Sequence, residues 1–471
     1  MHDYLGNPVS ADHSGSLSAI DDFIGGLLAY ETRAERAIAA ADADPHGCLI
    51  NVYAGFLWML LEAPEAPRRA VRYLSAARDA AREATRRERL NVALLEAWVA
   101  ADLPAALRLC ERISDEFPRD LAIVKLHQYL EFNRGDFPAM LRVALKVIER
   151  NADVPHMHGM AAFAYEQCHL LDEAQAAART ALCMLRKEPW AQHALAHVLL
   201  TRGSIDEGAQ FLEGVIDTWT GLNSFMLTHL WWHLALFHLS QGREHSVLDI
   251  YDRRCWAVAK DYSQDQVGAV SLLARVELAG IEVGGRWLEL GERLAARAGD
   301  TVQPFLTLQY LYGLGRAHRA EAQALLEAIR VQARDAPAFT RPVWQEVALP
   351  AGEGLYAHAR GHYDTAWRRL ERVLPRIGEI GGSHAQRDLF DLIALDAAVK
   401  SGRLIAAQRL LELRRVRDAN GVPVNAALAQ VYGQLGLAGL AAQARQRAQD
   451  TRDRFRSQDS LPLIAPRAPP G

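Results

Sequence analysis

Apolar and polar residues alternate along most of the chain with a period near 3.6, the period of an amphipathic α-helix. Ala, Leu, Arg and Glu dominate these stretches, and most of them are strong helix formers. The strict two-residue alternation of β-strands is almost absent. The pattern therefore predicts an all-α protein.

The helical pattern repeats at a fixed interval. A small or apolar residue recurs every 34 residues, at Ala106, Met140, Ala174 and Gly208. Five residues before each stands the residue at which we expect one helix to end, namely Ala101, Gly135, His169 and Gly203. The same register returns at Gly242/Val247, Gly361/Ala366, Gly402/Ala407 and Gly436/Ala441, and more loosely at Gly315/Ala320. A helix, a tight turn and a second helix at this interval are typical of the tetratricopeptide repeat.

A single unit of this kind cannot bury its apolar face alone, so we expect the units to stack into a right-handed superhelix, an α-solenoid closed on itself. The superhelix is expected over residues 19–455, after an N-terminal segment of residues 1–18. Residues 251–310 fit the period worst and predict an irregular unit. The Pro-rich tail, residues 456–471, is expected to be disordered.

Composition and charge indicate the possible partners and the cellular compartment of the protein. The net charge of −4 implies no general affinity for nucleic acid or acidic membranes. Five scattered cysteines without a CxxC pair argue for a reducing compartment and against a disulfide framework or a zinc ribbon. The chain begins without a signal-peptide pattern, and no apolar run approaches the roughly 18 residues that span a bilayer. We therefore expect a cytoplasmic, bacterial protein.

Histidines gather at positions that face the groove of such a superhelix. The first helix of each unit lines the concave surface, and the repeat register places four polar residues there: Glu166, His193, His197 and His229. Trp232 also falls in the groove, with His233 one step to the side. Three interpretations stay open: buried packing, polar contacts to a ligand, and acid–base chemistry near neutral pH.

A metal is a further alternative. His193 and His197 are four residues apart, a spacing that suits two zinc ligands on one helix face. There is no HExxH motif, and a third ligand would have to come from a neighbouring unit, such as His229 or Glu166. We therefore expect no cofactor, and less than one zinc ion per chain.

A second motif, "GGSHAQRD", spans residues 381–388. Ser383 and Gln386 are spaced as a capping box at a helix start, which leaves His384, Arg387 and Asp388 unexplained. Arg387 suits a carboxylate or phosphate, and Asp388 suits the orientation of a histidine. We expect these residues to close a pocket of at least roughly 300 Å³ over the groove histidines. Imidazoles beside a carboxylate should have raised pKa values.

These motifs resemble the tetratricopeptide repeat protein 38 family over most of the chain. The resemblance rests on "HALAH" at 193–197, "HLWWHLAL" at 229–236, "YD" at 251–252 and the complete "GGSHAQRD". The chain departs from the family pattern at Leu199, where the family has an acidic residue, and at 306–312, where a family histidine is missing. The resemblance implies a repeat solenoid and no settled activity.

The residues favour a protein that binds a small polar or anionic molecule, or a peptide segment, in its groove. The expected ligand contacts are His193, His197, His229, His233, Trp232, Glu166, His384, Gln386 and Arg387. The first alternative is an enzyme with acid–base or hydrolytic chemistry on His193, His229, His233, Asp252, His384 and Asp388. The second alternative is a protein–protein interaction scaffold. We expect no nucleic-acid or membrane partner, and the oligomeric state stays open.

Overall fold

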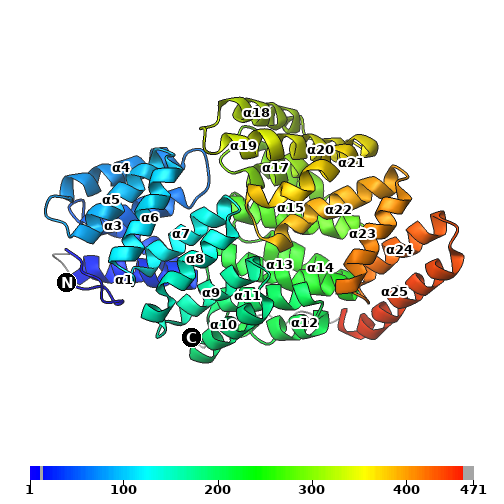
Figure 1. Cartoon of the computed structure of the whole chain (residues 1–471), viewed down its shortest axis with the longest axis horizontal. Helices are drawn as coiled ribbons and strands as arrows, with labels where there is room; N and C mark the ends of the chain where they lie inside the picture. Colours follow the sequence, from blue (N-terminus) through cyan, green and yellow to red (C-terminus); the bar gives the residue numbers. More distant parts are fainter. Residues whose placement is uncertain (11–13, 460–471) are drawn as a thin grey trace. The chain divides into compact units, whose positions relative to one another are not determined.

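The computed structural model describes residues 1–10 and 14–459 (Figure 1). Within these ranges the regular structure is helical, and the β-type pairings are isolated bridges of His2 with Pro8 and of Glu31 with Leu222. The predicted all-α class is confirmed, and the chain has a tetratricopeptide-like helical-repeat fold. No helix in the described part combines the length and apolar character needed to cross a membrane.

The chain divides into two compact units. The first comprises Met1–Leu195 with Trp219–Asn223, and the second comprises Ala196–Thr218 with the chain from Ser224 onward. The helices of the first unit are α1 (Ser14–Ala29), α2 (Arg36–Ala43), α3 (Cys48–Met59), α4 (Ala66–Ala80), α5 (Arg86–Val99), α6 (Leu103–Glu116), α7 (Leu121–Asn133), α8 (Phe137–Val147), α9 (Pro155–Gln167) and α10 (Leu171–Met184).

Helix α11 (Pro189–Arg202) contributes its first residues to the first unit and its last to the second. The second unit continues with α12 (Ile205–Glu213), α13 (Ser224–Gln241), α14 (Glu244–Ile250), α15 (Ser263–Leu278), α16 (Arg286–Leu294), α17 (Pro304–Arg316), α18 (Glu321–Asp335), α19 (Arg341–Val343), α20 (Leu349–Ala359), α21 (Tyr363–Val373), α22 (His384–Lys400), α23 (Leu404–Arg417), α24 (Val422–Gln434) and α25 (Ala438–Asp459).

The predicted turn residues end the first helix of each pair in the left-handed region of backbone space. Ala101 has a φ of 57° and His169 one of 59°. The glycines at the equivalent positions have φ between 73° and 80°, and they are Gly135, Gly203, Gly242, Gly361, Gly402 and Gly436. At every one of these turns the next helix begins two residues later. The repeat register read from the sequence is therefore confirmed at these positions.

Hydrogen bonds at one such turn show why the chain reverses there. The amide of Gly135 donates to the carbonyl of Phe132, and that of Asp136 donates to the carbonyl of Glu131, both at 3.0 Å. This pair of bonds satisfies carbonyl groups that the helix end would otherwise leave open, and it requires a left-handed residue.

The predicted pair Gly315/Ala320 is wrong. The left-handed residue is His318, with a φ of 54°, whereas Gly315 lies inside α17 and Ala320 is exposed. A Cβ atom on Gly315 would lie 2.8 Å from that of Ala359, so this glycine is needed for the close approach of α17 to α20. Close helix packing, and not a turn, therefore explains why glycine stands at position 315.

Small residues occupy the helix crossings, as the register predicts. Ala174, Ala407 and Ala441 are at most 1% exposed. A Cβ atom on Gly208 would lie 2.3 Å from the ring of Phe237, so the glycine lets this ring of α13 pack directly on the backbone of α12.

The stretch expected to be irregular keeps a helix pair. A π-helical turn, Tyr251–Cys255, follows α14, and a loop then leads to α15. Helices α15 and α16 pack on one another. The departure from the repeat therefore lies in the π turn and the linkers.

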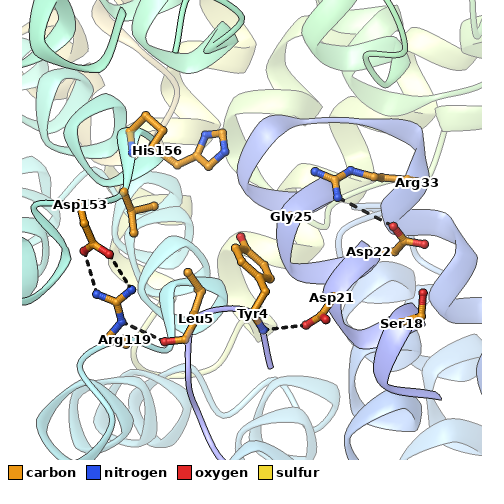
Figure 2. A pocket seen from close by; sticks show the side chains of 12 residues that line it. Tyr4, Leu5, Ser18, Asp21, Asp22, Gly25, Arg33, Arg119, Asp153 and His156 are labelled. Atoms are coloured by element: carbon orange, nitrogen blue, oxygen red, sulfur yellow. Dashed lines mark hydrogen bonds and ion pairs between the residues drawn. The ribbon is translucent and has the colours of Figure 1, made fainter. Parts of the chain in front are cut away.

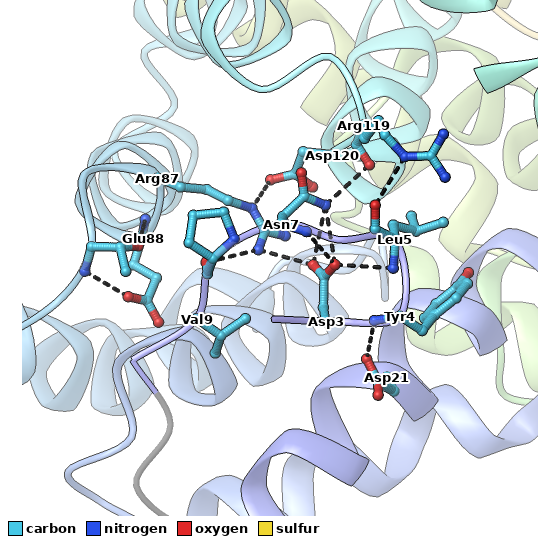
Figure 3. A network of polar contacts seen from close by, with 12 residues as sticks. Asp3, Tyr4, Leu5, Asn7, Val9, Asp21, Arg87, Glu88, Arg119 and Asp120 are labelled. Atoms are coloured by element: carbon cyan, nitrogen blue, oxygen red, sulfur yellow. Dashed lines mark hydrogen bonds and ion pairs between the residues drawn. The ribbon is translucent and has the colours of Figure 1, made fainter. Parts of the chain in front are cut away.

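The N-terminal segment is packed into the first unit (Figure 3). Arg87 Nη1 lies 2.9 Å from Asp3 Oδ2, and Arg87 Nε lies 2.6 Å from Asp120 Oδ2, with all three side chains almost fully buried. Asp3 Oδ1 also accepts hydrogen bonds from the amides of Leu5 and Asn7. The first residues of the chain thus share a buried charge network with α5 and the start of α7.

Two expected boundaries fall inside helices. Helix α1 begins at Ser14, within the expected N-terminal segment of residues 1–18. Helix α25 runs to Asp459 and includes the first residues of the expected tail, whereas the rest of the tail, 460–471, lies outside the described residues.

The end of the second unit returns to its beginning. Helices α24 and α25 pack against α13, and α25 also packs against α14 (Figure 1). Asp459 accepts hydrogen bonds from the amides of His245 and Ser246 at the start of α14, at 3.3 and 2.9 Å. Ser240 donates to Asp418 at 2.6 Å. The second unit therefore closes on itself through hydrogen bonds between residues that are 178 to 214 positions apart in the chain.

Candidate functional site

Helix α13 holds two histidines in the interior of the second unit. Its sequence, SFMLTHLWWHLALFHLSQ, is apolar on all sides, which is typical of a fully buried helix. His229 and His233 stand one turn apart and are 7% and 0% exposed. Trp232, between them, is 1% exposed.

The rings around these residues are in direct contact. The His229 ring stacks on Trp232, with centroids 5.2 Å apart and planes 8° from parallel. It meets His233 edge-on at 4.7 Å. His197, from the last turns of α11, lies 4.5 Å from His233. One ring nitrogen of each of the three histidines lies within 4.8 Å of the others.

The second motif reaches the same place. The His384 ring, at the first residue of α22, lies 5.4 Å from the His197 ring and nearly perpendicular to it. We call His197, His229, His233 and His384 the histidine cluster. All four belong to the second unit, so the structure brings the two sequence motifs together within one compact body.

The start of α22 is built as the sequence predicts. The Ser383 hydroxyl accepts a hydrogen bond from the Gln386 amide at 3.2 Å, and the Gln386 side chain accepts one from the Ser383 amide at 3.0 Å. This capping box is confirmed. Because the cap uses the Gln386 side chain, that residue positions the helix, and its expected ligand contact stays a prediction.

Two arginines flank the cluster. Arg387 is 9% exposed, and its guanidinium donates to the carbonyl of Gly382. Arg275 on α15 is 3% exposed and donates to the Ala385 carbonyl at 2.6 Å. The Arg275 guanidinium also lies 5.3 Å from the centre of the Trp232 ring. Burial lowers the pKa of Arg275 to about 10, so the group still carries its charge at neutral pH.

The two aspartates proposed for catalysis are held by arginines. Asp388 pairs with Arg414 at 2.7 Å and lies 4.0 Å from Arg275. Burial alone would raise the pKa of Asp388, but the Arg414 guanidinium holds it below its usual value. Asp252 forms a two-pronged pair with Arg286 at 2.8 and 2.7 Å and is half exposed. Both carboxylates are thus engaged with arginines.

His193 and Glu166 belong to the first unit, as the chain divides. The His193 ring stacks on Trp190 at 4.5 Å and lies 5.0 Å from Phe163. The Glu166 carboxylate accepts a hydrogen bond from Gln167 at 2.6 Å. Both side chains are at most 1% exposed. Their expected roles in the ligand site stay predictions.

The expectation of raised histidine pKa values is wrong for His229. Burial, together with the nearby His197, lowers the pKa of His229 to about 3. Transfer of a cationic imidazole from water into an apolar site is costly, and the charge of a second imidazole nearby adds to this cost. His229 is therefore a neutral imidazole at physiological pH.

Two residues near the cluster were missed in the sequence. Arg275 is the lone charge within the apolar stretch SLLARV, which is a visible signal for a buried, bonded guanidinium. Gln309 on α17 is fully buried, and neither of its amide atoms hydrogen-bonds to the described part of the chain. It lies one turn after Phe305, which packs against Gly382. No spacing rule distinguishes Gln309 from its neighbours.

A cavity of about 510 Å³ lies elsewhere, in the first unit (Figure 2). Asp21, Asp22 and Arg33 line one side, and Arg119 with Asp153 lines another. Arg119 and Asp153 bind each other at 2.8 and 3.0 Å, and Arg33 lies 3.8 Å from Asp22. Both guanidinium groups of this cavity therefore lie beside a carboxylate of its lining.

No family model matches the chain. Solved structures of helical-repeat proteins resemble it at low identity. A monomeric mutant of IFIT1 with Gppp-AAAA is 12% identical, with 94% of this chain and 98% of that one covered and a TM-score of 0.41. The human IFIT1 dimer with m7Gppp-AAAA is 12% identical, covers 91% and 95%, and has a TM-score of 0.38. The TPR domain of P58(IPK) is 14% identical, covers 80% and 100%, and has a TM-score of 0.22.

Proposed function

We propose that the chain binds a small polar or anionic molecule at the histidine cluster of the second unit. The observation that carries this proposal is the contact of His384 with His197, at 5.4 Å. It joins the start of α22 to the buried imidazoles of α11 and α13.

The charge around α22 suits an anion. The amino-terminal end of a helix carries a partial positive charge, and α22 is 17 residues long. Arg387 and the buried Arg275 add two guanidinium groups beside that end. Asp388 offsets part of this charge, at 4.0 Å from Arg275. A carboxylate or phosphate group would therefore be favoured over a cation.

Buried polar groups supply further donors. The indole N–H of Trp232 donates to no group in the described part of the chain, although the residue is 1% exposed. On α17, Gln309 is a second fully buried residue whose amide atoms have no hydrogen-bond partner in the described part of the chain. A buried donor without a partner costs about 1–3 kcal/mol, a cost that a polar ligand would offset. We include in this proposal the pocket of at least roughly 300 Å³ that the sequence predicts over the groove histidines.

The protein family that we propose follows from the sequence motifs. The match of "HALAH", "HLWWHLAL" and "GGSHAQRD" supports membership of the tetratricopeptide repeat protein 38 family. The same proposal places the protein in the bacterial cytoplasm, on the basis of its composition. A peptide segment in place of a small molecule, and a protein scaffold, are the alternatives to be separated by experiment.

Enzyme activity is a second candidate, favoured by the gathering of four imidazoles. General acid–base chemistry needs a group that titrates near the working pH. Asp252 and Asp388 are held by arginines, and burial lowers the pKa of His229 to about 3, so these three groups do not suit this role. His384 is the most exposed member of the histidine cluster, so it is the imidazole that a substrate would reach most easily.

The binding proposal is tested by equilibrium dialysis of the full chain against a panel of small anions that includes inorganic phosphate and citrate. We expect saturable binding of at least one class. Replacement of Arg387 by Ala, or of His384 by Ala, should lower its affinity about 10–100-fold, since a hydrogen bond to a charged group contributes about 1.5–3 kcal/mol.

The matched control is Arg376→Ala. Arg376 is also in the second unit, is half exposed and pairs only with Glu346 and Glu379 among the contacts of the described chain. Affinity should be unchanged in this variant. Equal affinity in the wild type and in the Arg387→Ala and His384→Ala variants would refute the site.

A further inference from the structure

We infer that His197, His229 and His233 bind one divalent transition-metal ion. The inference rests on the proposed function, because it names the group through which the histidine cluster would hold an anionic ligand. It replaces the expectation of a metal-free chain, which rested on the absence of an HExxH motif and on the need for a third ligand from a neighbouring unit.

In the structure, His197 of α11 approaches the two histidines of α13 and provides a third imidazole. His229 and His233 stand one turn apart on α13 and so share a face of that helix. His197 approaches from α11, with its ring 4.5 Å from that of His233. One nitrogen of each ring lies within 4.8 Å of the others. Nitrogen ligands of a tetrahedral zinc ion lie about 3.4 Å apart, so a shift of about 1 Å per ring completes the site.

The other buried histidines of the second unit behave differently. His238 binds Glu213 at 3.0 Å, and His358 binds Asp396 at 2.8 Å, which accounts for both as structural residues. In the cluster, imidazole contacts imidazole. Imidazole nitrogen donors suit Zn²⁺, Cu²⁺, Ni²⁺ or Co²⁺ rather than Mg²⁺ or Ca²⁺.

Aromatic side chains and His384 surround the three imidazoles. Trp232 stacks on His229 and meets His233 edge-on, so it fixes both rings. A nitrogen of His384 lies within 4.8 Å of one of His197. His384 is therefore placed to contact a group bound beside His197.

The inference is tested with Co²⁺, which occupies tetrahedral zinc sites and absorbs visible light there. The full-length chain is stripped with a chelator and titrated with Co²⁺ alone. We expect one ion per chain and a visible ligand-field spectrum. His229→Gln/His233→Gln should weaken binding by more than the roughly 10–100-fold that loss of an outer-shell partner costs. His362→Gln, at an exposed histidine, should leave it unchanged.

A second variant keeps the test valid if the double variant fails to fold. His233→Cys should retain Co²⁺ and add a thiolate-to-cobalt charge-transfer band in the near ultraviolet, because a thiolate is itself a metal ligand. The absence of one-to-one Co²⁺ binding in the wild type, or of that band in a folded His233→Cys chain, overturns the inference.

The outcomes separate this inference from the proposed function. Anion binding by the metal-free chain, together with no Co²⁺ spectrum, would leave the ligand site standing without a metal. Stoichiometric Co²⁺ with no anion bound in either state would leave the metal site standing without the proposed ligand.

Discussion

At the scale of single residues, burial decides the charge of the groups near the cluster. Asp265, in the first turn of α15, is 1% exposed and accepts hydrogen bonds from the Ala259 amide at 3.1 Å and the Thr228 hydroxyl at 3.3 Å. Burial raises its pKa to about 7, in spite of these hydrogen bonds. Thr228 precedes His229, so a carboxyl group that titrates near neutrality adjoins the helix of the site.

This gives the first prediction. The folded chain holds the Asp265 proton up to a pH of about 7, whereas the unfolded chain loses it near 4, so Asp265 weakens folding as the pH rises from 4 through 7. Asp265→Asn should therefore be more stable than the wild type at pH 8, by on the order of 2–4 kcal/mol. At pH 4 the difference should vanish. Urea unfolding at both pH values measures it.

The control is Asp261→Asn, at an aspartate that is almost fully exposed and whose ion pair with Arg293 is long. Its effect on stability should be small at both pH values. An Asp265→Asn variant with the same stability change at pH 4 and pH 8 would contradict the assigned protonation.

Which residues gather could be predicted from the sequence, but their charge states could not. The repeat register placed His197 and His229 on one inner surface because helix periodicity is local information. Asp388 was expected to orient a histidine, yet it pairs with Arg414, which lies on the next helix, α23. The choice between these partners depends on distances across the fold, and a linear pattern does not contain them.

At the scale of helices and turns, a residue in the left-handed backbone conformation ends the first helix of each of these pairs. Most of the turns use glycine, but Ala101 and His169 adopt the same φ with a side chain. A left-handed conformation costs a residue with a Cβ atom roughly 1–2 kcal/mol, whereas glycine adopts it freely. Ala101 and His169 therefore carry strain that the glycine turns avoid.

The second prediction uses this difference. Ala101→Gly should stabilise the chain by about 0.5–1 kcal/mol, because the relief of strain exceeds the extra flexibility of the unfolded glycine. Gly402→Ala should destabilise it by about 1 kcal/mol, and strain alone must be responsible, since no atom lies within 4 Å of the added Cβ. Thermal unfolding of the two variants measures both effects.

Gly439→Ala is the matched control, because Gly439 is helical and its added Cβ also meets open space. That change should stabilise the chain slightly through helix propensity. If both glycine substitutions shift the midpoint in the same direction, the left-handed backbone is not the cause.

The repeat register predicted the turns well and failed where local geometry departs from the period. The π-helical turn at Tyr251–Cys255 inserts extra backbone without a composition signal. At Gly315 the same residue type serves close packing against Ala359, so a glycine alone did not mark the turn. His318 takes the turn position, and histidine carries no signal for it.

At the scale of the whole chain, each unit is closed by its own long-range contact. In the first unit Asp3 binds Arg87, and in the second Asp459 binds the start of α14. These two contacts stabilise the folded state in different ways. Asp3 compensates a fully buried guanidinium, whereas Asp459 caps a helix near the surface.

The third prediction follows from this division. Calorimetry of the full chain should show more than one unfolding transition, because the two units are separate compact bodies. Asp3→Ala should lower the transition of the first unit, by about 3–5 kcal/mol, because it removes one of the two carboxylates of a buried arginine. Asp459→Ala should lower the transition of the second unit by about 1 kcal/mol.

Each variant serves as the control for the other, since each should move one transition and spare the other. A double variant should show additive shifts, because distant sites with no shared partner do not couple. A single transition that both substitutions lower together would show that the chain unfolds as one body.

The return of α25 to α14 has a consequence for synthesis. The two ends of that contact are 213 residues apart in the chain. A ribosome that adds about 5–20 residues per second needs roughly 10–40 s to travel between them. During that interval the nascent second unit exposes the start of α14, and it also lacks His384 for most of that time. The histidine cluster is therefore completed late in translation, and until then its apolar walls are open to chaperones.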